Sequence, residues 1–80
     1  MNEQLWHRIS VDPKVMVGKP VVRGTRIPVE LIVRMLAQGI PENDILLEHP
    51  GLQRDDIRAA LAYAAEVLAN EDVFPLAAPA

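Results

Sequence analysis

The chain has 80 residues and a mass of 8.8 kDa, which leaves room for one small domain and excludes a multidomain enzyme. It has no cysteine, and its two histidines lie far apart, so the sequence predicts neither a disulfide nor a zinc site. The net charge of −3 argues against a protein that coats nucleic acid. A domain of this size is marginally stable alone, so the sequence predicts association with another chain.

The charges are unevenly distributed along the chain. Residues 1–34 carry six basic and three acidic side chains, whereas residues 35–80 carry two basic and eight acidic ones. This asymmetry indicates two surfaces for different partners. The first residues lack the pattern of a signal peptide, and no segment reaches the roughly 18 apolar residues of a membrane span. We therefore expect a cytoplasmic protein with no membrane partner.

Short apolar runs bounded by turn residues predict a small strand unit in the first third of the chain. The runs are Ile9–Val11, Val15–Val17 and Pro20–Ile27. Asp12 and Pro13 end the first run, and Gly18 ends the second. The third run is rich in β-branched residues around Gly24, which indicates a strand that bulges or bends at the glycine.

The next segment predicts a helix over residues 29–38. Pro28 suits the start of a helix, and Glu30 places a negative charge at the positive end of the helix dipole. Apolar residues recur at helical spacing until Gly39, which is expected to end the helix.

Two further helices are predicted downstream. A short one starts at Pro41, carries Ile45 and Leu46 inward, and ends at His49-Pro50-Gly51. The longest has an apolar stripe at spacings of three and four residues and is expected to end at Asn70 in a left-handed cap. Its stripe consists of Ile57, Ala60, Leu61, Ala64, Val67 and Leu68.

These elements predict a mainly α fold, in which a small N-terminal β-strand unit precedes a three-helix helix-turn-helix bundle of the winged-helix or homeodomain-like kind. We assign the domain to residues 1–72. Residues 73–80 form an apolar tail that contains two prolines. It is either a frayed terminus or a docking segment with Phe74 and Leu76 as anchors.

Two groups of basic residues are candidates for binding. Arg54 and Arg58 lie at the start of the third predicted helix, where a helix-turn-helix protein contacts bases, but Asp55 and Asp56 accompany them. A solvated, salt-bridged helix face explains this group better. The strand unit carries the second group, Lys19, Arg23 and Arg26. Its members suit phosphate or carboxylate, or they protect a solvated strand edge.

No catalytic constellation is recognisable. The chain has a single serine, Ser10, and its acids fall mostly on predicted helix exteriors. His7 and His49 are expected to pack or cap rather than to transfer protons, and Trp6 and Tyr63 to cover the edge of the core or of an interface. We therefore expect no enzyme activity, cofactor, metal ion or small-molecule substrate.

The sequence resembles domain-of-unknown-function family 433 (DUF433) over about residues 9–68. The resemblance is carried by three runs, residues 9–13, 18–29 and 56–65, of which the glycine-containing central one is long and specific. It implies a homodimer with a strand-plus-helix-turn-helix fold that acts as a VapB-type antitoxin of a PIN-like ribonuclease toxin, with repression of its own operon as a further role. Pro41 and Gln53 stand where the family commonly has serine or threonine, so both following helices are expected to lose an N-cap.

The resemblance implies two routes to neutralisation. Arg23 or Arg26 is expected to enter the carboxylate cluster that holds the metal ion of a PIN-like site. Alternatively, the tail wraps the toxin and buries Phe74 and Leu76. A stand-alone dimeric helix-turn-helix regulator remains the alternative function. Its DNA-binding candidates are Lys19, Arg23, Arg26, Arg54 and Arg58.

Overall fold

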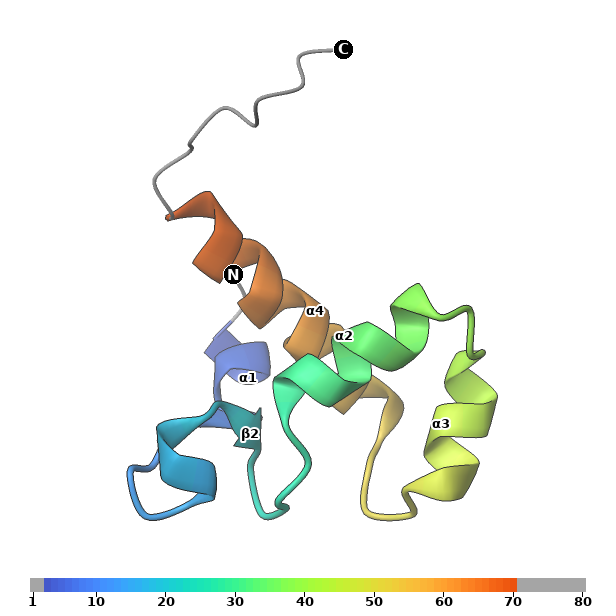
Figure 1. Cartoon of the computed structure of the whole chain (residues 1–80), viewed down its shortest axis with the longest axis horizontal. Helices are drawn as coiled ribbons and strands as arrows, with labels where there is room; N and C mark the ends of the chain where they lie inside the picture. The colour runs from blue at the N-terminus through green and yellow to red at the C-terminus, as the bar shows by residue number, and fades with distance from the viewer. Residues whose placement is uncertain (1–2, 71–80) are drawn as a thin grey trace, which may run out of the picture.

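Three helices make up most of the molecule, and a small antiparallel sheet and a short N-terminal helix pack beside them (Figure 1). The computed structural model describes residues 3–70. In chain order the elements are α1 (Glu3–Trp6), β1 (Ile9–Ser10), β2 (Val21–Val22), α2 (Val29–Ala37), α3 (Glu42–Glu48) and α4 (Arg54–Ala69), with a 3-10 turn, η1, over Met16–Gly18. The predicted mainly helical class, its three helices α2, α3 and α4 and its small antiparallel strand unit are confirmed. Helix α1 has only four residues, too few for a periodic pattern, and was not predicted.

The two strands pair antiparallel, with Ile9 opposite Val22. Beyond β2 the chain reverses, and the backbone N–H of Val22 donates to the carbonyl of Ile27 at 3.0 Å. Gly24, with φ of 80°, lies in this reversal and supplies a conformation that other residues adopt only with strain. The predicted bend at Gly24 is therefore a tight turn that ends the strand at Val22.

The boundaries of α2 and α3 follow from proline and glycine, as predicted. Pro28 and Pro41 precede the first residues of the two helices, in extended conformation. Gly39 follows α2 with φ of 84°, and the next N–H, that of Ile40, returns to the carbonyl of Met35 at 3.1 Å. This pairing satisfies a carbonyl that the helix end would otherwise leave open.

Helices α3 and α4 both start without an N-cap side-chain hydrogen bond, as expected at Pro41 and Gln53. At α4 a capping box that was not predicted compensates in part, because the Asp56 carboxylate accepts the Gln53 backbone N–H at 2.8 Å. At the other end, Asn70 has φ of −102°, so it does not adopt the predicted left-handed conformation. Its side-chain amide instead donates to the carbonyl of Glu66 at 2.7 Å and satisfies the helix end that way.

The hydrophobic core lies where α2, α3 and α4 meet. Ile32, Ile45 and Ile57, one from each helix, are completely buried there. Ile9 and Val22 close the core from the sheet side. Figure 1 shows α2 crossing the first half of α4, with α3 packed at one end and the second half of α4 extending beyond them. Among residues 3–70, no helix is both long enough and apolar enough to cross a membrane.

Candidate functional site

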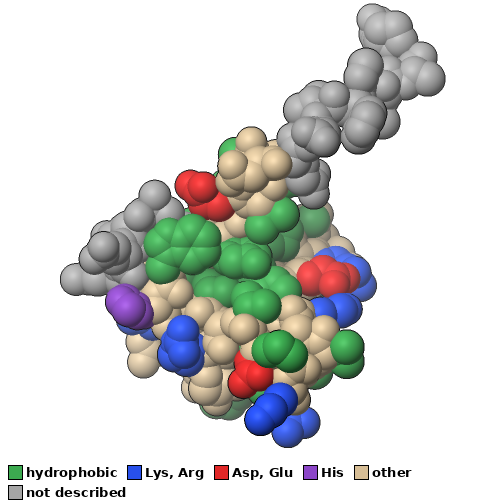
Figure 2. Space-filling view, turned by 90° about the vertical axis from the view of Figure 1, so that its left-hand side faces the viewer, with side chains coloured by type: hydrophobic (Ala, Val, Ile, Leu, Met, Phe, Trp, Pro, Cys, Tyr) green, Lys and Arg blue, Asp and Glu red, His purple; other side chains and the backbone are tan. Residues whose placement is uncertain are grey.

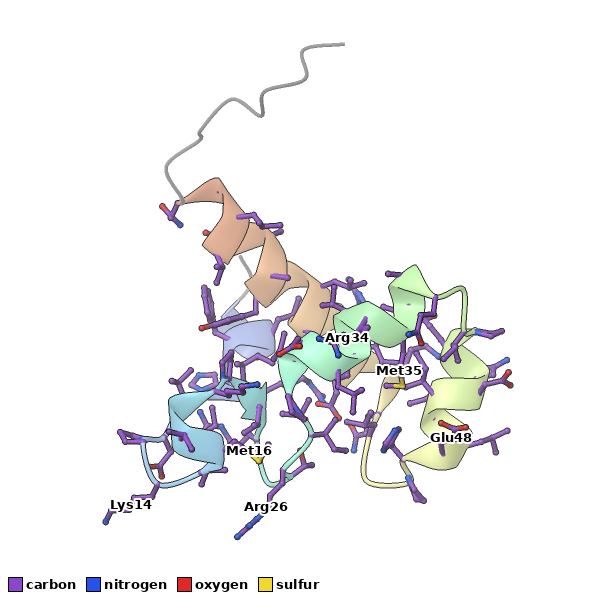
Figure 3. The ribbon with its side chains drawn as sticks, in the orientation of Figure 1. Lys14, Met16, Arg26, Arg34, Met35 and Glu48 are labelled. Atoms are coloured by element: carbon purple, nitrogen blue, oxygen red, sulfur yellow. The ribbon has the colours of Figure 1, made fainter. Side chains whose placement is uncertain are left out.

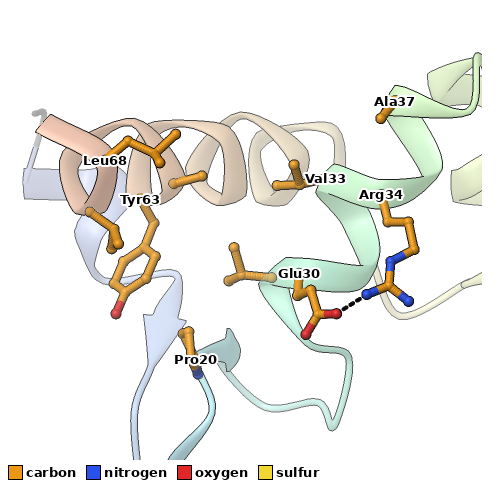
Figure 4. A pocket seen from close by; sticks show the side chains of 10 residues that line it. Pro20, Glu30, Val33, Arg34, Ala37, Tyr63 and Leu68 are labelled. Atoms are coloured by element: carbon orange, nitrogen blue, oxygen red, sulfur yellow. Dashed lines mark hydrogen bonds and ion pairs between the residues drawn. The ribbon is translucent and has the colours of Figure 1, made fainter. Parts of the chain in front are cut away.

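An open apolar groove of about 490 Å³ runs between α2 and the C-terminal half of α4 (Figure 4). Val29, Val33 and Ala37 line it from α2, and Val67 and Leu68 line it from α4. It exists because the apolar stripe of α4 is longer than the helices that cover it. Figure 2 shows hydrophobic side chains gathered into a continuous patch on one face, with charged side chains at its margin.

The uncovered part of this stripe continues the core-facing side of α4. Ile57 and Ala60 are fully buried under the other helices. One and two turns further along the same side, Ala64 is half-buried, whereas Val67 is exposed. The neighbouring Leu68 is 65% exposed. A surface of this kind, apolar and aligned with the core, is typical of a site that another segment covers.

Tyr63 and Pro20 line the groove on the side of α1 and the sheet. Tyr63 lines the groove and meets Trp6 of α1 edge to face, with ring centroids 5.7 Å apart. Pro20, which precedes β2, lies near the Tyr63 ring (Figure 4). The predicted role of Trp6 and Tyr63 at the edge of the core is consistent with this packing.

The rim of the groove is charged but internally neutralised. The Glu30 carboxylate pairs with Arg34 one turn along α2 and with Lys19, whose ammonium lies 3.5 Å away. Lys19, a candidate for DNA binding, is thus engaged in an exposed ion pair at this rim. The groove therefore offers an apolar surface and little net charge from α2.

The other two basic candidates of the strand unit differ sharply. The Arg23 guanidinium donates to the backbone carbonyls of His7 at 2.6 Å and Ile9 at 3.1 Å. It ties the N-terminal segment to the turn after β2, which is a structural task. Arg26 is exposed and has no hydrogen bond or ion pair among residues 3–70. Figure 3 shows it projecting from the turn, away from the helices.

The turn that carries Arg26 is held by its own hydrogen bonds. The Thr25 hydroxyl donates to the carbonyl of Val22 at 2.7 Å and accepts the N–H of Ile27 at 3.0 Å. Lys14 projects from the preceding loop at the same end of the molecule (Figure 3). This end therefore presents unneutralised positive charge from a backbone that side-chain hydrogen bonds hold in place.

The basic candidates on α4 are both paired with acids. Arg54 reaches back to α3, with nitrogens 3.1 Å from a Glu42 oxygen and 2.7 Å from the Asn43 oxygen. Arg58 lies 3.7 Å from Asp55, three residues earlier. The salt-bridged helix face that we predicted for this group is confirmed.

One partly buried ion pair was not recognised from the sequence. Arg8, next to β1, donates to the Asp56 carboxylate at 3.0 Å and to the Gln53 side chain at 3.2 Å. The Asp56 side chain is only 8% exposed. The two residues lie 48 positions apart, so no spacing rule connects them. A carboxylate at the third position of a predicted helix was the one available signal.

The loop between the strands contains an unusual backbone. Met16 and Val17 have φ of 51° and 56°, a left-handed conformation that is strained for a β-branched residue. Val17 is also 96% exposed, so the second apolar run of the sequence is a surface turn rather than part of the core.

Replacing Val17 by asparagine should therefore stabilise the fold by about 0.5–1 kcal/mol, because asparagine tolerates the left-handed region and no buried contact is lost. Urea unfolding followed by circular dichroism measures the change. The same substitution at Val11, which is exposed but has no positive φ, is the matched control and should bring no gain. Equal effects at both positions would show that the backbone of Val17 is not strained.

Phe74 and Leu76 lie outside the described residues. Among residues 3–70, no cluster of three or more histidine, aspartate or glutamate side chains is arranged to hold a metal ion.

The comparisons with known proteins assign a family. Residues 9–64 match the family described as Protein of unknown function (DUF433). The match spans well over half of the chain, and the protein belongs to this family. A crystal structure of a DUF433 member protein from Anabaena variabilis ATCC 29413 is similar, with a TM-score of 0.72 and 36% sequence identity. The similarity covers 80% of this chain and 63% of that one.

Two curated proteins are also similar, and both are described as uncharacterized. One, from Archaeoglobus fulgidus, is 68% identical over 28 residues, which are 35% of this chain and 78% of the archaeal protein. The other, y4eO from Sinorhizobium fredii, is 38% identical over 56 residues, which are 70% of this chain but 25% of its own length. The chain thus spans less than two thirds of the Anabaena protein and a quarter of y4eO.

Proposed function

We propose that the protein is a VapB-type antitoxin that binds and neutralises a PIN-like ribonuclease. The observation that carries the proposal is Arg26, an exposed arginine on a hydrogen-bonded turn with no partner among residues 3–70. A guanidinium presented in this way can pair with two oxygens of a carboxylate. A nuclease site that gathers carboxylates around a divalent cation is complementary to it, because the arginine can take the place of the metal ion.

The hydrogen bonds of Arg23 support Arg26, rather than Arg23, as the arginine that contacts the toxin. The Arg23 guanidinium donates to two backbone carbonyls of the N-terminal segment, so replacing this side chain is expected to disturb the fold. We therefore assign the toxin contact to Arg26. Phe74 and Leu76 remain a second proposed contact, through the apolar tail.

The alternative, a dimeric regulator in which α2, α3 and α4 act as a helix-turn-helix unit on operator DNA, has weaker support. Both arginines at the start of α4, Arg54 and Arg58, are neutralised by acidic side chains. Contacts with DNA phosphates need positive charge that is not already paired, so α4 is poorly suited to bind DNA. Autoregulation of the operon by the strand unit of a homodimer is compatible with the antitoxin proposal.

Co-expression with the product of the adjacent reading frame tests the proposal. We expect a complex that co-elutes in size-exclusion chromatography, with its stoichiometry measured by light scattering. The ribonuclease activity of the neighbour should be suppressed in this complex. Elution of the protein alone, with the neighbour fully active, would contradict neutralisation of that neighbour and would make binding to operator DNA the next measurement.

A further inference from the structure

We propose that the groove between α2 and α4 is the docking site of a segment of the same chain, Val73–Leu76. This segment follows α4 after a short link. The proposal concerns the free chain, and it holds or fails independently of whether the protein's partner is a ribonuclease. It goes beyond a toxin contact because it gives the apolar tail a binding site on the domain itself.

The chemistry of the groove selects an apolar occupant without charge. Its walls are the aliphatic side chains of Val33, Val67 and their neighbours, and the charges at its rim are already paired. An occupant also brings backbone N–H groups, each of which is unfavourable in an apolar site unless it finds an acceptor. A segment that offers large apolar side chains and few free N–H groups is therefore favoured.

The segment Val73-Phe74-Pro75-Leu76 meets these requirements. It contains three apolar side chains of sufficient size and no charge. Pro75 has no N–H at all, so the backbone in the middle of the segment has no unpaired donor to bury. The charged residues Glu71 and Asp72 precede it, where they can remain in solvent.

The length of the link is sufficient for this docking. Four extended residues span roughly 13–14 Å, which is the reach from Asn70 to Phe74. Along the helix, Tyr63 lies roughly 10 Å back from Asn70 at about 1.5 Å per residue. If the chain turns back after α4, Phe74 can therefore reach any level of the groove wall that runs from Leu68 to Tyr63.

The short link also favours the chain's own groove over that of a second copy. A few residues of linker keep the segment at an effective concentration in the millimolar range, far above the concentration of other copies. Even weak docking is then sufficient to cover the groove. A partner that takes up Phe74 and Leu76 must first draw them out of the groove, which lowers its apparent affinity.

Ending the chain at Asp72 tests the docking. Two-dimensional amide NMR should show changed signals for Val33 and Ala37, which line the groove but lie far from residue 72 in the sequence. Trp6 is the only tryptophan and contacts Tyr63, so its fluorescence emission should shift as well. If the shortened chain does not fold, the full-length Phe74→Ala variant should give the same changes.

A synthetic peptide of residues 73–80 provides the second arm. The peptide should bind the shortened chain and restore the signals of Val33. It should bind the full-length chain more weakly, by at least about tenfold, because the attached segment competes for the groove. Val67→Lys in the groove should abolish peptide binding. The matched control is Leu47→Lys near the end of α3, where leucine is 79% exposed and outside the groove; it should bind the peptide normally.

Two outcomes would overturn the proposal. Unchanged signals of Val33 and Ala37 after truncation would show that the segment does not occupy the groove. Signals that revert to those of the shortened chain on dilution, together with a dimer in light scattering, would show that the groove is filled by a second copy instead.

Discussion

Asp56→Ala should destabilise the fold by about 2–3 kcal/mol, because it removes a buried carboxylate that satisfies two donors. Asp56 accepts one Arg8 nitrogen at 3.0 Å and the Gln53 backbone N–H at 2.8 Å. Arg8 is about one third exposed and can recover part of its hydration, so the loss falls below that of a fully buried pair. A domain of this size has only about 5 kcal/mol of stability, so the midpoint of thermal unfolding should fall by about 10–20 °C.

Asp55→Ala is the matched control for this prediction, since it makes the same change in charge at the adjacent position. Asp55 is more than half exposed and lies 3.7 Å from its arginine partners, so its removal should change the free energy of unfolding by no more than about 0.5 kcal/mol. Chemical unfolding of both variants and of Arg8→Ala measures the coupling. Equal decreases in the free energy of unfolding for Asp55→Ala and Asp56→Ala would mean that the buried ion pair of Asp56 stabilises the fold no more than the exposed ion pairs of Asp55.

The helices were predictable because their signals are local. Pro28 and Gly39 bound α2 in the sequence as they do in the structure. The predicted stripe of α4 is only partly buried, since Ile57 and Ala60 lie in the core whereas Leu61 is 44% exposed. The strand unit was harder to predict. An apolar run predicts burial, yet Val17 lies almost fully in solvent, because closure of the loop between the strands determines its position.

The candidate site was only partly predictable, for a related reason. The sequence shows that arginine is present at positions 8, 23 and 26, but it does not show what each guanidinium meets. Arg8 meets a carboxylate 48 residues away, and Arg23 meets backbone carbonyls that only the fold brings near. The groove likewise depends on how far α4 extends beyond α2, and this is determined by the packing of the helices rather than by a local sequence pattern.

Arg26→Ala should weaken the complex with the toxin by about 3 kcal/mol, roughly a hundredfold in Kd, if this arginine pairs with the carboxylates of the nuclease site. Removal of the guanidinium leaves those carboxylates free to bind the metal ion again, so ribonuclease activity should return at antitoxin concentrations that fully inhibit it with the unchanged chain. Arg26→Lys keeps the charge but loses the paired donors, so its effect should be intermediate. Titration of ribonuclease activity with each variant measures the effect.

The fold should not respond to this change, since Arg26 makes no hydrogen bond or ion pair within residues 3–70. An unchanged unfolding midpoint for Arg26→Ala would therefore show that weaker inhibition comes from a lost contact with the toxin and not from unfolding of the antitoxin. Arg58→Ala removes the same charge from the exposed, salt-bridged face of α4 and should leave inhibition within about twofold of normal. Equal weakening by both variants would indicate a diffuse electrostatic attraction, and undiminished inhibition by Arg26→Ala would move the toxin contact to the tail.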